Sequence, residues 1–167
     1  MEIVISTSNA VDSKVKQYKK TLIIGAGNIL LGDEGVGVRI VEKMEQGVPL
    51  PSQVTLLDGG TAGYALLDYM SGYERLILID AVQGKGRPGE IYRLTYDDIL
   101  REQEFKISGH QISLPEVLTL AKNLGTLPET VLFGVEPERM EYSLELSETV
   151  AKAVDPVIQA VLKEVTD

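Results

Sequence analysis

Four side chains in this sequence combine acid–base or metal-binding chemistry with positions where a site could form: Glu34, Asp58, Asp80 and His110. Glu34 closes a glycine-bearing loop, Asp58 precedes two glycines, and Asp80 follows a buried-type apolar run. Glu34, Asp80 and His110 together make a mixed oxygen and nitrogen ligand set that suits nickel, zinc or iron. Three protein ligands also leave coordination positions open for water or substrate. We therefore predict that these three side chains lie close enough to share one ion.

Each of these residues also has a purely structural interpretation. Glu34 lies just before an expected helix, where a carboxylate complements the helix dipole, and Asp33 could cap that helix. Asp80 could accept hydrogen bonds from loop amides, although a carboxylate beside apolar residues is desolvated unless it is paired. His110 is the only histidine of the chain, and a lone histidine is more often structural than a ligand.

The glycine-rich segment that begins with Gly25-Ala26-Gly27 invites comparison with nucleotide-binding loops. Its third glycine comes late, at Gly32, so the spacing differs from the dinucleotide fingerprint. No Lys-Ser or Lys-Thr pair follows, and Asp33 and Glu34 place negative charge where a phosphate needs positive charge. The segment is better explained as a tight turn between a strand and a helix.

Familiar hydrolase signatures are missing from the sequence. There is no cysteine, no Gly-x-Ser-x-Gly elbow, and no His-Glu-x-x-His pair, which a single histidine could not form. A Ser-His-Asp triad would have to use His110, with Ser108 or Ser113 in no recognisable setting. An aspartic dyad of Asp58 and Asp80 is conceivable, although the Asp-Thr-Gly type of motif is missing.

Alternating apolar runs and helical patterns surround the candidate residues. Strands are predicted at residues 22–24, 54–57, 76–79, 91–96 and 130–135, and helices at 36–46, 64–70, 112–124 and 147–165. This order predicts an α/β three-layer sandwich, with a largely parallel twisted sheet of about five strands and helices on both faces. In such sheets ligands bind beyond the carboxyl ends of the strands, which is where Glu34, Asp58 and Asp80 fall. Residues 1–20 are expected to be an N-terminal extension and residues 21–167 a single domain.

Composition narrows the classes of partner. The formal net charge is -9, from 16 Lys and Arg against 25 Asp and Glu. An acidic balance argues against nucleic acid and against anionic membranes. The sequence shows neither a signal-peptide pattern nor an apolar run long enough for a membrane span, so we expect a cytoplasmic protein.

Five ordered motifs resemble those of the nickel–iron hydrogenase maturation endopeptidases. They are Gly25-Ala26-Gly27-Asn28-Ile29-Leu30-Leu31-Gly32-Asp33-Glu34-Gly35-Val36-Gly37, Leu57-Asp58-Gly59-Gly60-Thr61-Ala62-Gly63, Leu78-Ile79-Asp80-Ala81, Gly109-His110-Gln111 and Gly134-Val135-Glu136-Pro137. The resemblance extends over about residues 21–165, and only residues 1–20 have no counterpart.

The resemblance implies an enzyme that removes a short C-terminal peptide from the precursor of a hydrogenase large subunit after nickel insertion. The family's metal-contacting residues fall on Glu34, Asp80 and His110, and the aspartate of its Asp-Gly-Gly motif falls on Asp58. Nickel would then be supplied by the substrate, with no organic cofactor. We expect a monomer, because the site must stay open to a large partner. Two alternatives are a non-catalytic metal- or nucleotide-binding module and a docking factor that holds the precursor while another protein cuts it.

Overall fold

The computed structural model of this chain describes residues 18–101, 105–107 and 113–167. The strands are β1 (Thr21–Ala26), β2 (Val54–Gly60), β3 (Arg75–Gln83), β4 (Ile91–Thr95), β5 (Lys106–Ile107) and β6 (Glu129–Val135). The helices are η1 (Gly32–Gly35), α1 (Val36–Glu45), η2 (Gly63–Ala65), α2 (Leu66–Met70), α3 (Tyr96–Ile99), α4 (Leu114–Asn123), α5 (Glu148–Ala151) and α6 (Val154–Thr166).

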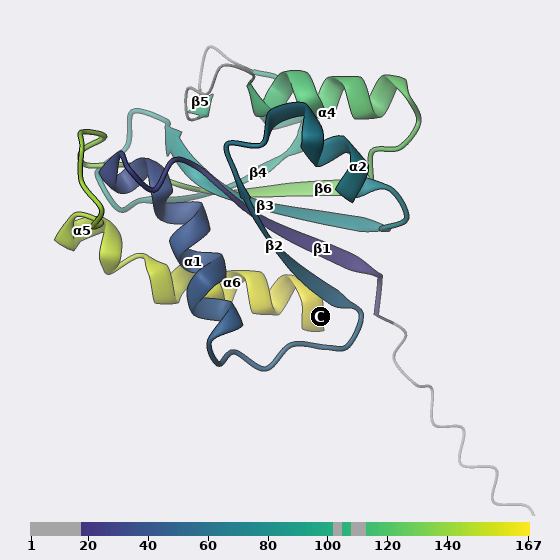
Figure 1. Cartoon of the computed structure of the whole chain (residues 1–167), viewed down its shortest axis with the longest axis horizontal. Helices are drawn as coiled ribbons and strands as arrows, with labels where there is room; N and C mark the ends of the chain where they lie inside the picture. The colour runs from purple at the N-terminus through teal and green to yellow at the C-terminus, as the bar shows by residue number, and fades with distance from the viewer. Residues whose placement is uncertain (1–17, 102–104, 108–112) are drawn as a thin grey trace, which may run out of the picture.

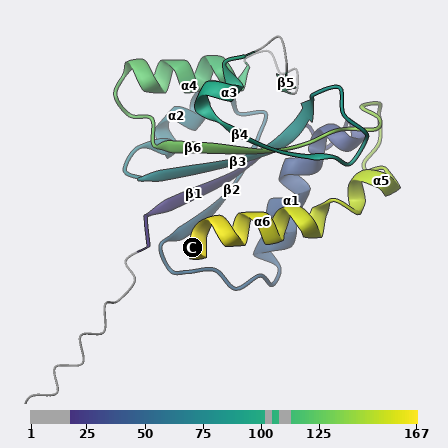
Figure 2. The same ribbon diagram turned by 180° about the vertical axis from the view of Figure 1, so that it is seen from behind.

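Within the described ranges the sheet has six strands, with the order β2-β1-β3-β6-β4 and the short β5 paired to β3. β1, β2, β3 and β6 run parallel to one another, whereas β4 is antiparallel to β6 and β5 is antiparallel to β3. Figures 1 and 2 show α1 and α6 on one side of the sheet and α2 and α4 on the other. This arrangement confirms the predicted α/β fold with a largely parallel sheet.

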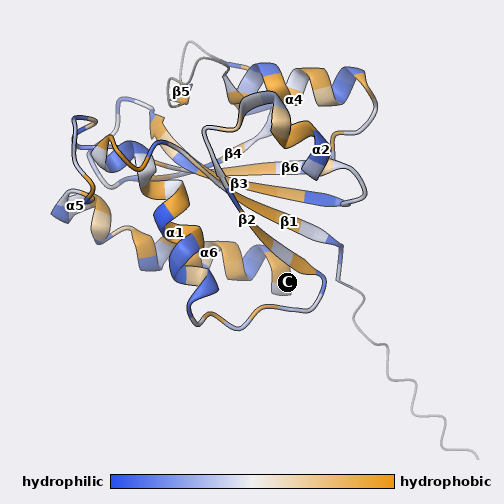
Figure 3. Ribbon diagram, in the orientation of Figure 1, coloured by the Kyte–Doolittle hydropathy of each residue, from blue (hydrophilic) through white to orange (hydrophobic). Residues whose placement is uncertain are grey.

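Strand β3 separates two hydrophobic cores because its side chains alternate between the two faces of the sheet. Ile77, Ile79 and Ala81 pack in the core beneath α1 and α6. Leu78 and Val82 pack in the core beneath α2 and α4. In Figure 3 the central strands are coloured as hydrophobic along much of their length, as expected for strands covered on both faces.

Three boundaries differ from the sequence prediction. β3 does not end before Asp80 but continues to Gln83, because Ala81 and Val82 are buried and extend both cores. The predicted helix at 147–165 is two helices, α5 and α6. Pro156 explains the break, since it cannot donate a hydrogen bond to the carbonyl four residues earlier and its ring clashes there. The segment 97–106, given no prediction, contains most of α3 and the first residue of β5.

The remaining expectations on organisation concern the ends and membrane association. β1 begins at Thr21, where the predicted domain opens, but most of the predicted extension at residues 1–20 lies outside the described residues. Among the helices of the described ranges, none has both the length and the apolar character needed to cross a membrane.

Helix α1 approaches the centre of the sheet unusually closely at Gly37. A Cβ atom built there would lie 2.0 Å from the carbonyl oxygen of Ile79 and 2.5 Å from that of Ala26. Both contacts are with backbone atoms, which cannot move aside as a flexible side chain can. The absence of a side chain at Gly37 therefore allows the start of α1 to rest on β1 and β3 beside Asp80.

We predict that Gly37→Ala lowers the free energy of unfolding by about 3 kcal/mol or more, because the added methyl overpacks a rigid backbone contact. The matched control is Gly47→Ala, since a Cβ at Gly47 meets nothing within 4 Å. Urea unfolding of both variants checks the prediction. Equal stability of the two variants would show that α1 can shift without cost.

Candidate active site at the carboxyl edge of the sheet

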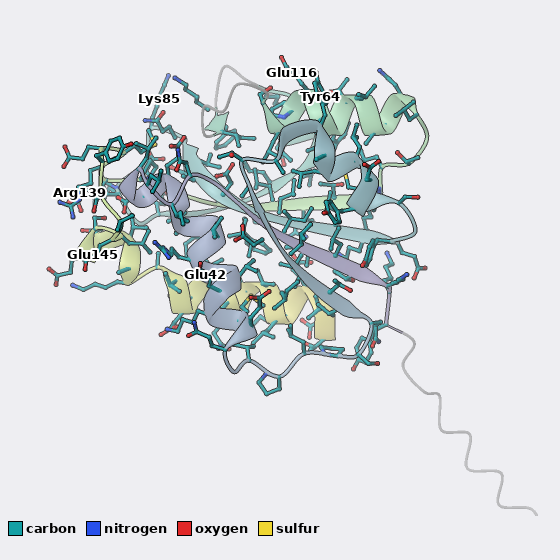
Figure 4. All side chains as sticks on the ribbon, viewed as in Figure 1. Glu42, Tyr64, Lys85, Glu116, Arg139 and Glu145 are labelled. Atoms are coloured by element: carbon teal, nitrogen blue, oxygen red, sulfur yellow. The ribbon has the colours of Figure 1, made fainter. Side chains whose placement is uncertain are left out.

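Three segments that follow parallel strands meet at one edge of the sheet. η1 follows β1, the loop 84–90 follows β3, and the segment 137–147 follows β6. Figure 1 shows the chain leaving β1, β3 and β6 on the same side of the molecule, and in Figure 4 the labelled Lys85, Arg139 and Glu145 lie on that side. This is the edge at which the sequence places the candidate site.

Asp80 is completely buried inside β3. Its neighbours Ile79 and Ala81 face α1 and α6, so the Asp80 side chain faces the opposite side, toward α2 and α4. The N–H of Ala81 donates a hydrogen bond of 2.8 Å to Oδ1 of Asp80. On the neighbouring strand β6, the residue paired with Asp80 is Gly134, which has no side chain. Asp80 is thus a carboxylate enclosed by the sheet and hydrogen-bonded to its own strand.

Glu34 is also buried, with only 6% of its surface exposed. Within the described ranges, its carboxylate has neither a hydrogen bond nor an ion pair, and it provides no cap for η1 or α1. Neither Glu34 oxygen is among the fully buried atoms of the described residues that lack a hydrogen bond, so the carboxylate keeps acceptor atoms open to solvent or to an incoming ligand. This environment makes Glu34 a functional candidate rather than a helix-dipole residue alone.

The fold brings the segment around Glu34 against the strand that carries Asp80. η1 contacts β3 directly. Gly27 turns the chain with a φ of 131°, and a Cβ at that position would lie 1.9 Å from the carbonyl oxygen of Glu34. Gly37, three residues after Glu34, touches the carbonyl of Ile79, which immediately precedes Asp80. Two of the three predicted ligands therefore come from elements in direct contact.

Asp33, next to Glu34, has the opposite environment. Its carboxylate is fully buried and accepts four hydrogen bonds from the segment that follows β6. The donors are the N–H groups of Glu138 (2.9 Å), Arg139 (3.0 Å) and Ser147 (2.7 Å) and the hydroxyl of Ser147 (2.8 Å). The interpretation of Asp33 as a cap of α1 is therefore wrong, because its acceptor atoms are engaged by residues more than 100 positions away.

Asp58 lies near the end of β2, the strand that pairs with β1. Its Oδ1 accepts a 2.9 Å hydrogen bond from the N–H of Gly60. Asp58 lines an open cleft of about 330 Å³, together with Gly27, Asn28, Ile29, Leu30, Val38, Gly60 and Thr61. Neither Glu34 nor Asp80 lines this cleft. Asp58 thus shares this cleft with the Gly27 turn and not with Glu34 or Asp80.

Glu136 fixes the loop that follows β3. Its Oε2 accepts hydrogen bonds of 2.7 Å from the N–H of Gly84 and from the hydroxyl of Tyr92. Burial of the phenol, together with the hydrogen bond to the Glu136 carboxylate, raises the pKa of Tyr92 to about 12. Tyr92 therefore stays a neutral hydrogen-bond donor throughout the physiological pH range, and the loop 84–90 is tied to the end of β6.

The third predicted ligand, His110, lies outside the described residues. Within the parts of the chain that the structure does describe, no three His, Cys, Asp or Glu side chains gather closely enough to hold an ion. Because the only histidine is not among them, the shared geometry of Glu34, Asp80 and His110 stays a prediction.

Sequence reasoning missed the structural roles of Asp33 and Glu136. Both are acidic residues that join distant segments of the chain by accepting hydrogen bonds from backbone N–H groups or hydroxyl groups. The only local signal is an acidic residue at the end of an apolar strand or within a glycine-rich turn, and that signal does not identify a partner.

Comparison with known proteins identifies close relatives of this chain. The family model described as "Hydrogenase maturation protease" matches residues 38–164. The hydrogenase 2 maturation protease of Escherichia coli strain K12 is 42% identical over 145 residues, which cover 86% of this chain and 88% of the relative. A hydrogenase expression/formation protein of Rhodobacter capsulatus is 37% identical over 149 residues, covering 87% of this chain and 71% of that protein.

Solved structures agree with these sequence matches. The hydrogenase maturating endopeptidase HybD from E. coli superposes with a TM-score of 0.79 and 41% identity, covering 86% of this chain and 90% of that one. A hydrogenase 2 maturation peptidase from the Thaumarchaeota archaeon SCGC_AB-539-E09 gives a TM-score of 0.66 at 33% identity, covering 89% and 99%.

The contrast between the adjacent acids Asp33 and Glu34 predicts different effects on stability. Asp33→Asn should lower the free energy of unfolding by about 2 kcal/mol or more, because an amide group would face backbone donors and lose charge-assisted hydrogen bonds. Glu34→Gln should change stability by less than about 1 kcal/mol, since among the described residues the Glu34 carboxylate has no hydrogen bond or ion pair to lose. Urea unfolding at neutral pH measures both. A larger loss for Glu34→Gln than for Asp33→Asn would contradict the assignment.

Proposed function

Because this chain belongs to the hydrogenase maturation protease family, we propose that it removes a C-terminal peptide from the nickel-loaded precursor of a nickel–iron hydrogenase large subunit. The family and its relatives are endopeptidases of hydrogenase maturation, so the chain is an enzyme of this class and not a non-catalytic binding module. The further step in the proposal is that the nickel carried by the substrate is what the enzyme recognises.

The observation that carries the proposal is the unpartnered carboxylate of Glu34 on η1, which contacts the strand of Asp80. Glu34 has no partner among the described residues, although only 6% of it is exposed. A divalent cation brought by the substrate would compensate this charge, and carboxylate oxygens suit such an ion. The unloaded precursor would provide no such compensation, so discrimination follows from the loss of a ligand interaction.

The protein residues have distinct proposed roles. Glu34, Asp80 and His110 contact the nickel ion of the substrate and orient the precursor. Asp58 contacts the substrate chain in the open cleft beside Gly60, where the lack of a side chain allows close approach of a backbone. A substrate-borne divalent ion can polarise a carbonyl or activate water, which is consistent with a chain that contains no cysteine.

The setting of the reaction follows from the same proposal. We place the enzyme in the cytoplasm. We expect it to be a monomer, because a transient protease must expose this edge of the sheet to a folded partner. The net charge of -9 favours a protein over nucleic acid as that partner.

Nickel dependence tests the proposal directly. Matched precursors with and without nickel are incubated with the purified chain, and release of the C-terminal peptide is followed by mass spectrometry. We expect cleavage only of the loaded precursor. Glu34→Gln and Asp80→Asn should lower kcat/KM by about 100-fold or more, because even outer-shell partners of metal ligands contribute about 10–100-fold. Glu45→Gln, an exposed acid at the end of α1, is the control and should cleave normally. Equal cleavage of both precursors would refute metal recognition.

Asp58 permits a separate test of the cleft. Asp58→Asn removes the charge but keeps an oxygen that can accept the N–H of Gly60. We expect kcat/KM to fall by roughly 10–100-fold, because a misplaced substrate chain loses its reactive geometry, while the urea unfolding midpoint stays unchanged. Normal turnover of Asp58→Asn would show that this carboxylate only shapes the turn.

A further inference from the structure

An exposed apolar surface lies beside the candidate site and has no role in the chemistry proposed above. It consists of Leu30, Met140, Tyr142 and Leu144, whose exposed fractions are 44%, 38%, 84% and 66%. We call these four residues the apolar rim. The hydrogen bond from Ser143 to the carbonyl of Leu30 brings Leu30 next to the segment that carries the other three, and exposed apolar side chains that gather in one place often mark a binding surface.

The backbone that carries the apolar rim is firmly held. Ser143 forms a bridge with Leu31, its N–H donates to the carbonyl of Leu30 (3.0 Å), and its carbonyl accepts from Gly32 (2.9 Å). Arg39 donates to the carbonyl of Leu144 (2.9 Å). These bonds fix the segment before any partner arrives, so the entropy cost of binding at this surface is small.

The segment packs its backbone, not its apolar side chains, against η1. A Cβ built at Gly32 would lie 3.2 Å from the carbonyl oxygen of Arg139 and 3.4 Å from that of Glu141. Backbone carbonyls of this segment thus face η1, while the side chains of Met140, Tyr142 and Leu144 remain exposed. The four hydrogen bonds to Asp33 hold the same segment next to Glu34.

We propose that the apolar rim is the docking surface for the folded precursor that this enzyme cleaves, an inference that rests on the proposed function. Leu30 belongs both to the apolar rim and to the cleft that contains Asp58, so one substrate can cover both surfaces continuously. An exposed tyrosine with a large apolar neighbour is the kind of anchor that dominates protein interfaces.

The charge around the apolar rim favours the precursor, and not a second copy of the same chain, as the protein that binds there. Glu138, Glu141 and Glu145 are exposed around the apolar rim, against the single cation Arg139 in that segment. A symmetric dimer through this surface would bring the same acidic residues of two copies together, and like charges at an interface are costly. A different protein, with its own charges, avoids this repulsion.

The double variant Tyr142→Ser/Leu144→Ser tests the docking surface, because both side chains are exposed and their loss should not affect folding. With nickel-loaded precursor we expect KM to rise about tenfold or more, as for truncation of interface anchors, while kcat changes by less than about twofold. The control is Leu124→Ser, an equally exposed leucine (62%) at the end of α4, which should keep both constants. An unchanged KM for the double variant would overturn the proposal.

Two further measurements separate the possible failures. Sedimentation of the wild-type chain and the double variant reports self-association, and a dimer lost only in the variant would overturn the proposal by assigning the surface to a second copy. If the wild-type chain cleaves no precursor, the proposed function fails by itself. The Kd between chain and precursor then decides the docking surface: a Kd raised about tenfold by the double variant would support it, and an unchanged Kd would overturn it.

Discussion

The buried carboxylate of Asp33 is the interaction on which the geometry of the sheet edge depends. It is fully buried, and it accepts four hydrogen bonds from the segment that follows β6. Without it, three backbone N–H groups at this edge would lose their acceptor, which costs more than the net value of an ordinary hydrogen bond. Asp33 thereby fixes η1, and with η1 the position of Glu34 relative to β3.

Adjacent acidic residues therefore serve opposite purposes in this fold. Asp33 accepts four hydrogen bonds and contributes to stability, whereas Glu34 has no partner among the described residues and keeps its acceptor atoms free. Local departures from the rules of stable design are expected at functional sites. A substrate-borne cation would bind the free acceptor atoms of Glu34, and only a precursor that carries the ion could supply it.

Much of the fold could be predicted because apolar runs and helical spacing are local signals. The strand before Asp80 and the helix after Glu34 were both found in this way, and their order predicted the carboxyl-edge site. The extension of β3 past Asp80 was missed because a buried carboxylate within a strand contradicts the usual pattern. The break before Pro156 was available in the sequence but was outweighed by apolar periodicity. The partners of Asp33 could not be predicted, since they are backbone groups more than 100 residues away.

The central claim is that carboxylates of this enzyme approach the nickel ion of its substrate. X-ray absorption at the nickel edge measures this directly, on the loaded precursor alone and on its rapidly frozen complex with the chain. The account predicts additional oxygen or nitrogen neighbours at about 2 Å from nickel in the complex, and their loss with Glu34→Gln or Asp80→Asn. Identical nickel spectra for the free and the bound precursor would contradict it.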